Sequence, residues 1–382
     1  MIRDWIKFIV FAAQVVLITS CATAVPPPQL RAYPADIAEL LSGRAILGHA
    51  VTESELPSID LFAISPEMEA FAKRAVRRGE NYFEKVTALH VALLTSAESG
   101  GHGILYSAYV TEAPITTFQQ RRANCLSFTL LYVALARAVG LDAKVNEVEI
   151  PPTWDMRNKN DMVFLRHVNV KVPMLGKGTN ILRRDDVVID LEMNRYRSNY
   201  RQYEISNTLA EAQFYSNRAM EYLEVGNFNG AFLSLRKSID LNNQQSYVWG
   251  NLGALFSRKK LVREAELAYL HALALNPEDL TVMNNLAYYY RQAGNKDEAL
   301  KFSRLAQRYR ESNPFYKYNL ALSAFEQKKY QQALHVVLQA IDSEKNDVRF
   351  YELAATLYEK LDRPAKVLQM QQTIKKLNMD YF

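Results

Sequence analysis

The order of apolar and polar positions divides the chain into three stretches. The first holds a short uncharged run from Phe8 to Ile18, preceded by Arg3 and Lys7. This run is about half as long as the roughly 20 apolar residues that a bilayer-spanning helix needs, so it predicts the core of a signal peptide. The middle stretch combines one strongly apolar helix with alternating, strand-like runs, and the last stretch is helical and periodic. An α+β domain followed by an all-α array is therefore expected.

The last stretch repeats with a period of 34 residues. Small side chains recur at this spacing in two series, which are Ala231, Ala265, Ala299 and Ala333, and, twelve positions earlier in each repeat, Ala219, Gly253, Ala287 and Ala321. Small residues at such positions let paired helices approach closely, and the pattern resembles the tetratricopeptide repeat. Five repeats beginning at 212, 246, 280, 314 and 348 would fill an array over 206–382. The second repeat matches best, through Trp249, Leu252, Gly253, Phe256, Ala265, Tyr269, Ala272 and Pro277.

The resemblance to tetratricopeptide repeats implies a protein or peptide partner. Such arrays bind partners on the faces of their first helices, and the repeat phasing places there Tyr247, Asn284, Tyr288, Arg291, Phe315, Tyr318 and Phe325. The alternative is that some of these aromatic side chains pack between repeats.

The middle stretch contains a helix that is apolar on nearly every face. It runs from Cys125 to Val139, after a good N-cap residue, Asn124, and before a plausible C-cap, Gly140. A helix of this composition should be central and buried. Cys125 then lies in the first turn, where unpaired backbone N–H groups and the helix dipole stabilise a thiolate and could hold an oxyanion.

Two further residues complete a possible nucleophile site. His167 begins the run HVNVKV, whose polar and apolar positions alternate as in a half-buried strand, and Asp190 ends a second β-like run. A carboxylate that orients an imidazole, and an imidazole that receives a thiol proton, form the usual arrangement for nucleophilic catalysis. Sequence order alone does not bring the three residues together.

The segments NCLSFTLLYVALARAVGLDA, HVNVKV and VVIDLE together resemble bacterial transglutaminase-like proteins of the papain-like cysteine fold. The resemblance covers about residues 36–205 and implies a cysteine peptidase or transamidase with Cys125, His167 and Asp190 as catalytic residues. It implies no cofactor. The chain departs from the family pattern at Val168, where an aromatic residue is usual, and at Leu191, where a proline is common. These departures leave the substrate open.

The end of the N-terminal apolar run resembles a lipobox. Ile18, Thr19 and Ser20 precede Cys21, and this resemblance implies cleavage of residues 1–20 and lipidation of Cys21. Ala22 after the lipidated residue favours the outer membrane under the known sorting rule, on its periplasmic side. The proline-rich residues 21–35 would form an extended tether. The alternative is an ordinary signal peptide that contains Cys21 by chance.

Composition fits a folded body behind such an anchor. Hydrophobic residues make up 49% and charged residues 23% of the chain. The net charge of +5 falls to +4 when Arg3, Asp4 and Lys7 leave with the leader, which is too mild an excess to indicate nucleic acid binding. With Cys21 lipidated, Cys125 has no cysteine to pair with, so it is either an inert buried side chain or a reactive thiol.

Other candidates carry weaker signals. Gln119 and Gln120 could supply an oxyanion donor or lie on the surface, and Trp154 could line an acyl site or anchor a loop. His90 is expected to be structural. No spacing of metal ligands is evident, so no metal is expected.

Two function classes remain. The first is an anchored cysteine enzyme that acts on an amide or ester bond, with repeats that recruit the substrate protein. The second is a binding lipoprotein in which the repeats carry the function and the papain-like domain is inert.

Overall fold

The computed structural model describes residues 34–107, 110–148, 167–174, 186–191, 201–345 and 347–379. The predicted signal peptide, Cys21 and nearly all of the tether lie outside these ranges, as does Trp154. None of the helices in the described ranges combines the length and the apolarity that crossing a bilayer requires.

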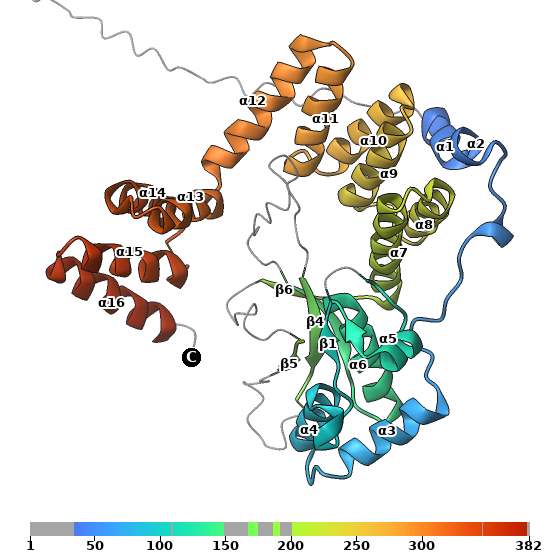
Figure 1. Ribbon diagram of the computed structural model, residues 1–382, viewed down its shortest axis with the longest axis horizontal. Coiled ribbons are helices and arrows are strands. Elements are labelled where there is room, and N and C mark those ends of the chain that lie inside the picture. Colours follow the sequence, from blue (N-terminus) through green and yellow to red (C-terminus); the bar gives the residue numbers. More distant parts are fainter. Residues whose placement is uncertain are drawn as a thin grey trace, which may run out of the picture. The chain divides into compact units, whose positions relative to one another are not determined.

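The first domain consists of helices around a small antiparallel sheet (Figure 1). Its helices are α3 (Pro66–Val76), α4 (Tyr82–Leu94), α5 (Pro114–Gln120) and α6 (Cys125–Ala138), with short 3₁₀ turns at Glu53–Glu55 and Ala97–Ser99. Its sheet has the order β5-β4-β3-β6, made of β3 (Lys144–Val148), β4 (His167–Val172), β5 (Val187–Ile189) and β6 (Gln202–Ile205). A separate parallel pair joins β1 (Leu105–Tyr106) to β2 (Arg122–Ala123).

Helix α6 is the centre of the first core, as its composition predicts. Every residue from Leu126 to Ala136 is buried. The Asn124 side chain caps the helix by accepting a hydrogen bond from Ser127 N–H at 2.8 Å, which confirms the predicted N-cap. The helix ends where Gly140 adopts a left-handed φ of 78°, which a glycine reaches without strain.

Strand β4 is more buried than the alternating pattern predicts. The half-buried strand that we expected is buried on both faces, with His167 and Asn169 as well hidden as the valines between them. The valine face packs on α6, where Thr129 Oγ1 donates to Val168 O at 3.3 Å. His167 and Asn169 can be buried on the polar face because both hydrogen bond Asp190 and Asn169 also accepts from Asn146, which satisfies groups that would otherwise need water.

The second half folds into paired helices. The pairs are α7 (Asn207–Glu224) with α8 (Phe228–Leu241), α9 (Ser246–Arg258) with α10 (Val262–Leu275), α11 (Leu280–Gln292) with α12 (Lys296–Ser312), α13 (Pro314–Glu326) with α14 (Tyr330–Ser343), and α15 (Val348–Lys360) with α16 (Pro364–Met379). Helices α9, α11, α13 and α15 start at the positions where the 34-residue count begins. The close approach expected of small residues is visible at Gly253, where an added Cβ would lie 2.5 Å from a ring carbon of Tyr269.

The array contains two buried clusters. One runs from α7 to α12 and includes Trp249, Phe256 and Phe302. The other belongs to α13–α16 and is centred on Phe350 and Leu357.

Two segments connect the first domain with the array. Helix α1 (Pro34–Ser42) and the short α2 (Arg44–Leu47) pack on α10 and α8, so that Leu40 joins the array's cluster and Asp36 pairs with Arg263 at 2.9 Å. Helix α7 belongs to both cores, because Phe214 and Tyr215 pack with the first domain whereas Ala219 and Leu223 pack with the repeats.

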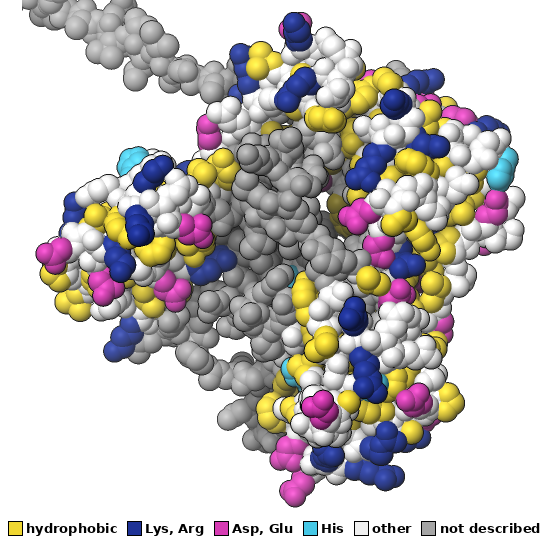
Figure 2. Space-filling view, in the orientation of Figure 1, with side chains coloured by type: hydrophobic (Ala, Val, Ile, Leu, Met, Phe, Trp, Pro, Cys, Tyr) yellow, Lys and Arg dark blue, Asp and Glu magenta, His cyan; other side chains and the backbone are white. Residues whose placement is uncertain are grey.

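Charged side chains are spread over the surface. Figure 2 shows lysine and arginine side chains interspersed with acidic ones over the visible face. This distribution matches the mild net charge of +5.

Candidate functional site

Cys125 is the first residue of α6 and is partly buried. The Asn124 cap takes two of the backbone donors of the first turn, since its side chain accepts from Ser127 N–H and its carbonyl accepts from Phe128 N–H. The N–H groups of Cys125 and Leu126 are therefore the first-turn donors available to an oxyanion, and they lie beside the sulfur.

His167 lies between Cys125 and Asp190. It starts β4, and Asp190 directly follows β5, which pairs with β4 through Val170 and Ile189. His167 Nε2 hydrogen bonds Asp190 Oδ2, and the Cys125 side chain lies close enough to the imidazole to contribute to the raised pKa of His167. Because Nε2 is engaged by the carboxylate, Nδ1 is the ring nitrogen left for the thiol. The structure thus brings together the three residues singled out from the sequence.

The environment of His167 favours the charged imidazole. Burial opposes protonation, but the hydrogen bonds to Asp190 and Cys125, with their negative charges, outweigh it and raise the pKa of His167 from 6.5 to about 9. His167 is 6% exposed and Asp190 1% exposed, so water screens these interactions weakly. An imidazolium next to the sulfur is the partner that a thiolate nucleophile requires.

Asp190 is held by two further polar side chains. Asn169 Nδ2 donates to Asp190 Oδ2 at 3.2 Å, and His90 Nε2 lies 3.1 Å from the Asp190 carbonyl oxygen. Burial lowers the pKa of His90, with the contacts to Asp190 opposing this effect, so the ring is neutral and must donate its Nε2–H to the carbonyl. Both ends of the aspartate are therefore fixed relative to His167.

A row of buried amides continues behind the aspartate. Asn146 on β3 pairs in register with Asn169 on β4, and Asn146 Nδ2 donates to Asn169 Oδ1 at 2.7 Å and to Gln202 Oε1 at 3.1 Å. Asn146 and Asn169 are both fully buried. The sequence pattern did not indicate this row of amides, and His90 was expected to be structural. The detectable signal was a polar residue in each of two successive strand-like runs, and the strand register needed to align them came only with the structure.

The weaker candidates are not part of this cluster. Gln119 and Gln120 end α5 with exposed side chains. Within the described ranges, no group of three or more His, Cys, Asp or Glu side chains is arranged to hold a metal ion.

The predicted partner-binding residues divide into two groups. Tyr288 is 57% exposed and Arg291 is also exposed, so both are accessible to a partner. Tyr318 and Phe325 pack against the buried cluster of α13–α16. The Tyr318 ring lies 5.2 Å from that of Phe350, and the Phe325 ring lies 5.8 Å from that of Tyr330. Tyr247 is partly buried against the first cluster. The side chain of Phe315 lies outside the described part of the chain.

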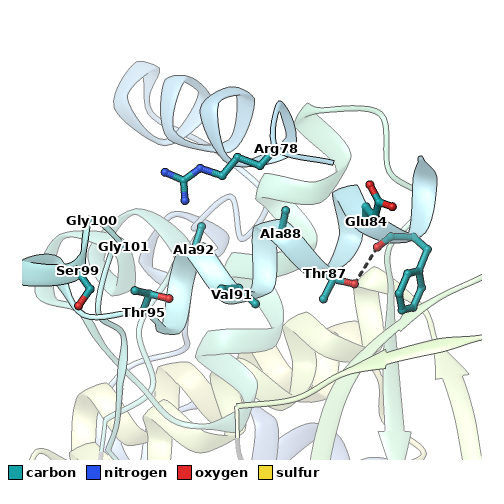
Figure 3. Close-up of a pocket in the computed structure, with 11 residues that line it drawn as sticks. Arg78, Glu84, Thr87, Ala88, Val91, Ala92, Thr95, Ser99, Gly100 and Gly101 are labelled. Carbon is teal, nitrogen blue, oxygen red and sulfur yellow. Dashed lines mark hydrogen bonds between the residues drawn. The ribbon is translucent and has the colours of Figure 1, made fainter. Parts of the chain in front are cut away.

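A pocket of about 390 Å³ lies along α4 (Figure 3). Its lining includes Arg78, Thr87, Val91 and Thr95, and Thr87 Oγ1 donates to the Phe83 carbonyl at 2.9 Å. The lining contains neither Cys125 nor His167, so this pocket is distinct from the cysteine site.

Comparisons with known proteins match one segment in each half of the chain. Residues 69–174 match the transglutaminase-like superfamily, a range that includes Cys125 and His167 and ends before Asp190. Residues 268–301 match the tetratricopeptide repeat.

A protein named for its tetratricopeptide repeats is among the relatives of the chain. A tetratricopeptide repeat-containing protein of Caenorhabditis elegans, trd-1, is 26% identical over 118 residues, which are 31% of this chain and only 15% of that relative. Among solved structures, pilF of Pseudomonas aeruginosa is 21% identical over 45% of this chain and 78% of its own, with a TM-score of 0.27. MamA of Desulfovibrio magneticus RS-1 is 12% identical over 44% of this chain and 96% of its own, with a TM-score of 0.25. The chain thus carries a transglutaminase-like domain followed by tetratricopeptide repeats.

Proposed function

We propose that the protein is a cysteine enzyme that cleaves or transfers an acyl group at an amide or ester bond. The observation that carries this proposal is the arrangement of His167, whose Nε2 hydrogen bonds Asp190 and whose ring lies near Cys125 at the first turn of α6. A buried thiol without a chemical role would not need a charged imidazole and a buried carboxylate beside it.

The reaction would begin with a Cys125 thiolate and a His167 imidazolium. The sulfur attacks the carbonyl carbon, a C–S bond forms, and the carbonyl π electrons move to oxygen. The N–H groups of Cys125 and Leu126 stabilise this oxyanion. As the oxyanion collapses, the bond to the leaving nitrogen or oxygen breaks, and His167 Nδ1 gives its proton to the leaving group. The product of this half-reaction is a thioester on Cys125.

The second half-reaction releases the acyl group. Neutral His167 takes a proton from water or from an amine, and this nucleophile attacks the thioester carbon. The C–S bond breaks and the thiolate–imidazolium pair is restored. Water yields a carboxylic acid and an amine yields a new amide. The choice between them depends on which nucleophile reaches the site. Throughout, Asp190 orients the ring and stabilises its charge.

The proposal includes an anchored location. The lipobox-like run before Cys21 supports diacylation of that residue, and Ala22 supports the outer membrane, facing the periplasm. In this location the tetratricopeptide array would recruit a protein substrate, with exposed Tyr288 and Arg291 as contact residues.

A comparison of variants on cell-envelope extract tests the proposed chemistry. The full chain and Cys125→Ala are incubated with extract, and mass spectrometry compares processed peptides and new isopeptide links. We expect products only with the intact thiol, strongly reduced products with Asp190→Asn, and unchanged products with His335→Ala, which alters an exposed histidine on α14. Identical products from wild type and Cys125→Ala would exclude the enzyme and favour a binding lipoprotein.

A further inference from the structure

Helix α7 contacts the first domain through an ion pair that is not part of the repeat core. Arg218 Nη1 donates to Glu221 Oε2 at 3.0 Å, and both side chains are about three-quarters buried. The two residues hold both backbone groups of Thr111. Thr111 N–H donates to Glu221 Oε1 at 2.6 Å, and Arg218 Nη1 donates to the Thr111 carbonyl at 3.3 Å. The first helix of the array therefore fixes the segment that leads into α5.

The same segment contacts the cap of α6. Asn124 Nδ2 donates to Thr111 Oγ1 at 2.8 Å, while the other atom of that amide, Oδ1, caps the helix. Glu112 N–H donates to Ser127 Oγ at 2.9 Å. Asn124, directly before Cys125, and Ser127, two positions after it, are thus both hydrogen bonded to residues 111–112, which α7 contacts.

The energetics of this link favour a rigid connection. Thr111, Asn124 and Ser127 are each at most 7% exposed, so an unmade hydrogen bond among them could not easily be replaced by water. Burial raises the pKa of Glu221, while the bond from Thr111 and the charge of Arg218 oppose this rise. Loss of Arg218 would leave the Glu221 charge partly buried and uncompensated, whereas loss of Glu221 would leave Arg218 with Glu112, whose Oε1 lies 3.4 Å from Arg218 Nη1.

We propose that Arg218 and Glu221 are positioning residues for Cys125. They act through Thr111 and Asn124, which set the first turn of α6 and so the direction of the sulfur and of the N–H groups beside it. This inference rests on the proposed nucleophilic role of Cys125. It makes the first repeat helix a component of the thiol site as well as the beginning of the array.

The test measures alkylation of Cys125 by iodoacetamide across a range of about pH 5 to pH 9, which covers thiolate formation at activated cysteines. The full chain carries Cys21→Ser, which leaves Cys125 as its single thiol. Because a disturbed cap weakens the donors of the first turn, we expect Arg218→Met and Glu221→Ala each to slow alkylation near pH 6.5 about fivefold and to move the rate profile to higher pH. Glu221→Gln keeps an acceptor for Thr111 N–H and should have a smaller effect.

A matched ion pair provides the control. Arg236 on α8 pairs with Asp240 at 3.0 Å, and its side chain is 23% exposed, against 24% for Arg218. Arg236→Met should leave the alkylation profile as in wild type. Thr111→Val removes the hydroxyl that accepts from Asn124, with little change in shape. The double variant Thr111→Val, Arg218→Met should slow alkylation by less than the two single effects combined, because both residues act on Asn124 through Thr111.

The outcomes separate this inference from the proposed function. If His167→Ala slows alkylation whereas Arg218→Met, Glu221→Ala and Thr111→Val match Arg236→Met, the positioning role is wrong and the proposed nucleophile stands. If wild-type Cys125 resists the reagent and His167→Ala has no effect, both are wrong. General loosening of the fold would instead speed alkylation at every pH, a result that would also overturn the positioning role.

Discussion

At the scale of single residues, the decisive contacts are those of His167. Its ring joins a thiol at a helix N-terminus to a carboxylate at the end of a strand, and burial strengthens both interactions. The charged form of the ring is therefore favoured in the folded chain more than in the unfolded one. This difference makes stability depend on pH.

We predict that the wild-type chain loses stability as the pH rises from about 6.5 to about 9, the interval between the ordinary and the folded pKa of His167. The stabilisation by charged His167 is complete below pH 6.5, where both states bind the proton. It is lost as the pH passes about 9, because the folded state then also releases the proton that the unfolded state has already lost. Urea denaturation at the two ends of this interval measures the loss. His167→Ala should lack this component, and equal pH dependence in the two proteins would contradict the prediction.

The three candidate residues were singled out from the sequence, but the side chains that contact Asp190 were not predictable from it. Cys125, His167 and Asp190 each follow from a local signal, namely a helix start, a strand start and a strand end. His90 and Asn169 contact Asp190 only because α4 and β4 bring them there, from positions 100 and 21 residues away. Local patterns carry no information on such distances.

At the scale of elements, the repeat pattern translates directly into packing. The 34-residue period sets the helix starts, and its small positions lie where helices meet. Strand β4 shows the opposite case. Its alternation indicated one solvent-exposed face, yet Asn146 on the neighbouring strand β3 donates to Asn169, and both side chains are buried.

Gly253 tests how tightly the paired helices pack. Gly253→Ala should lower the free energy of unfolding by about 1–3 kcal/mol, because the new methyl would overlap the buried Tyr269 ring, and this cost exceeds the gain of about 1 kcal/mol in helix propensity. Gly250→Ala on the same helix is the control. Its Cβ would lie 2.9 Å from one methyl of Val282, a less severe overlap than the three ring contacts at Gly253, so it should be less destabilising than Gly253→Ala. Thermal or urea unfolding of both variants gives the comparison, and equal stability of the two would contradict it.

Helix α7 lies within the array predicted over 206–382, but its residues pack in both buried cores. A fragment of residues 207–382 should be soluble and strongly helical, because α8–α16 keep their own buried clusters. We expect its α7 to exchange amide hydrogens quickly, since Phe214 and Tyr215 lose their partners in the first domain. Hydrogen exchange with mass spectrometry compares the fragment with the full chain. Equal protection of α7 in both would mean that the repeats alone stabilise it.

At the scale of the whole molecule, the chain joins a transglutaminase-like domain to tetratricopeptide repeats, behind a lipid anchor that is expected from the sequence. The anchor is predicted from Cys21 and the run before it, which lie outside the described residues. Its chemistry is nevertheless directly testable.

Cys21→Ser should abolish incorporation of a palmitate analogue and leave residues 1–20 attached, because serine offers no thiol for diacylation. Labelling of cells followed by purification and intact mass measurement detects both changes. Cys125→Ser, as the matched control, should be labelled like wild type. Equal labelling of Cys21→Ser and wild type would contradict the lipoprotein assignment.

The sharing of α7 and of the N-terminal helices also sets an order of events during synthesis. Helix α1 is made among the first parts of the folded body, yet its packing surface on α10 is completed only when residue 275 has been added. The contacts of Arg218 and Glu221 with Thr111, which in turn bonds the cap residue Asn124, likewise form only after about a hundred further residues have been added. Since domains generally fold as the growing chain supplies their parts, the thiol reaches its final environment late. A chain interrupted before α7 would lack the contacts of Arg218 and Glu221 with Thr111, so Cys125 reaches the surroundings it has in the folded chain only after the first repeat helix has been made.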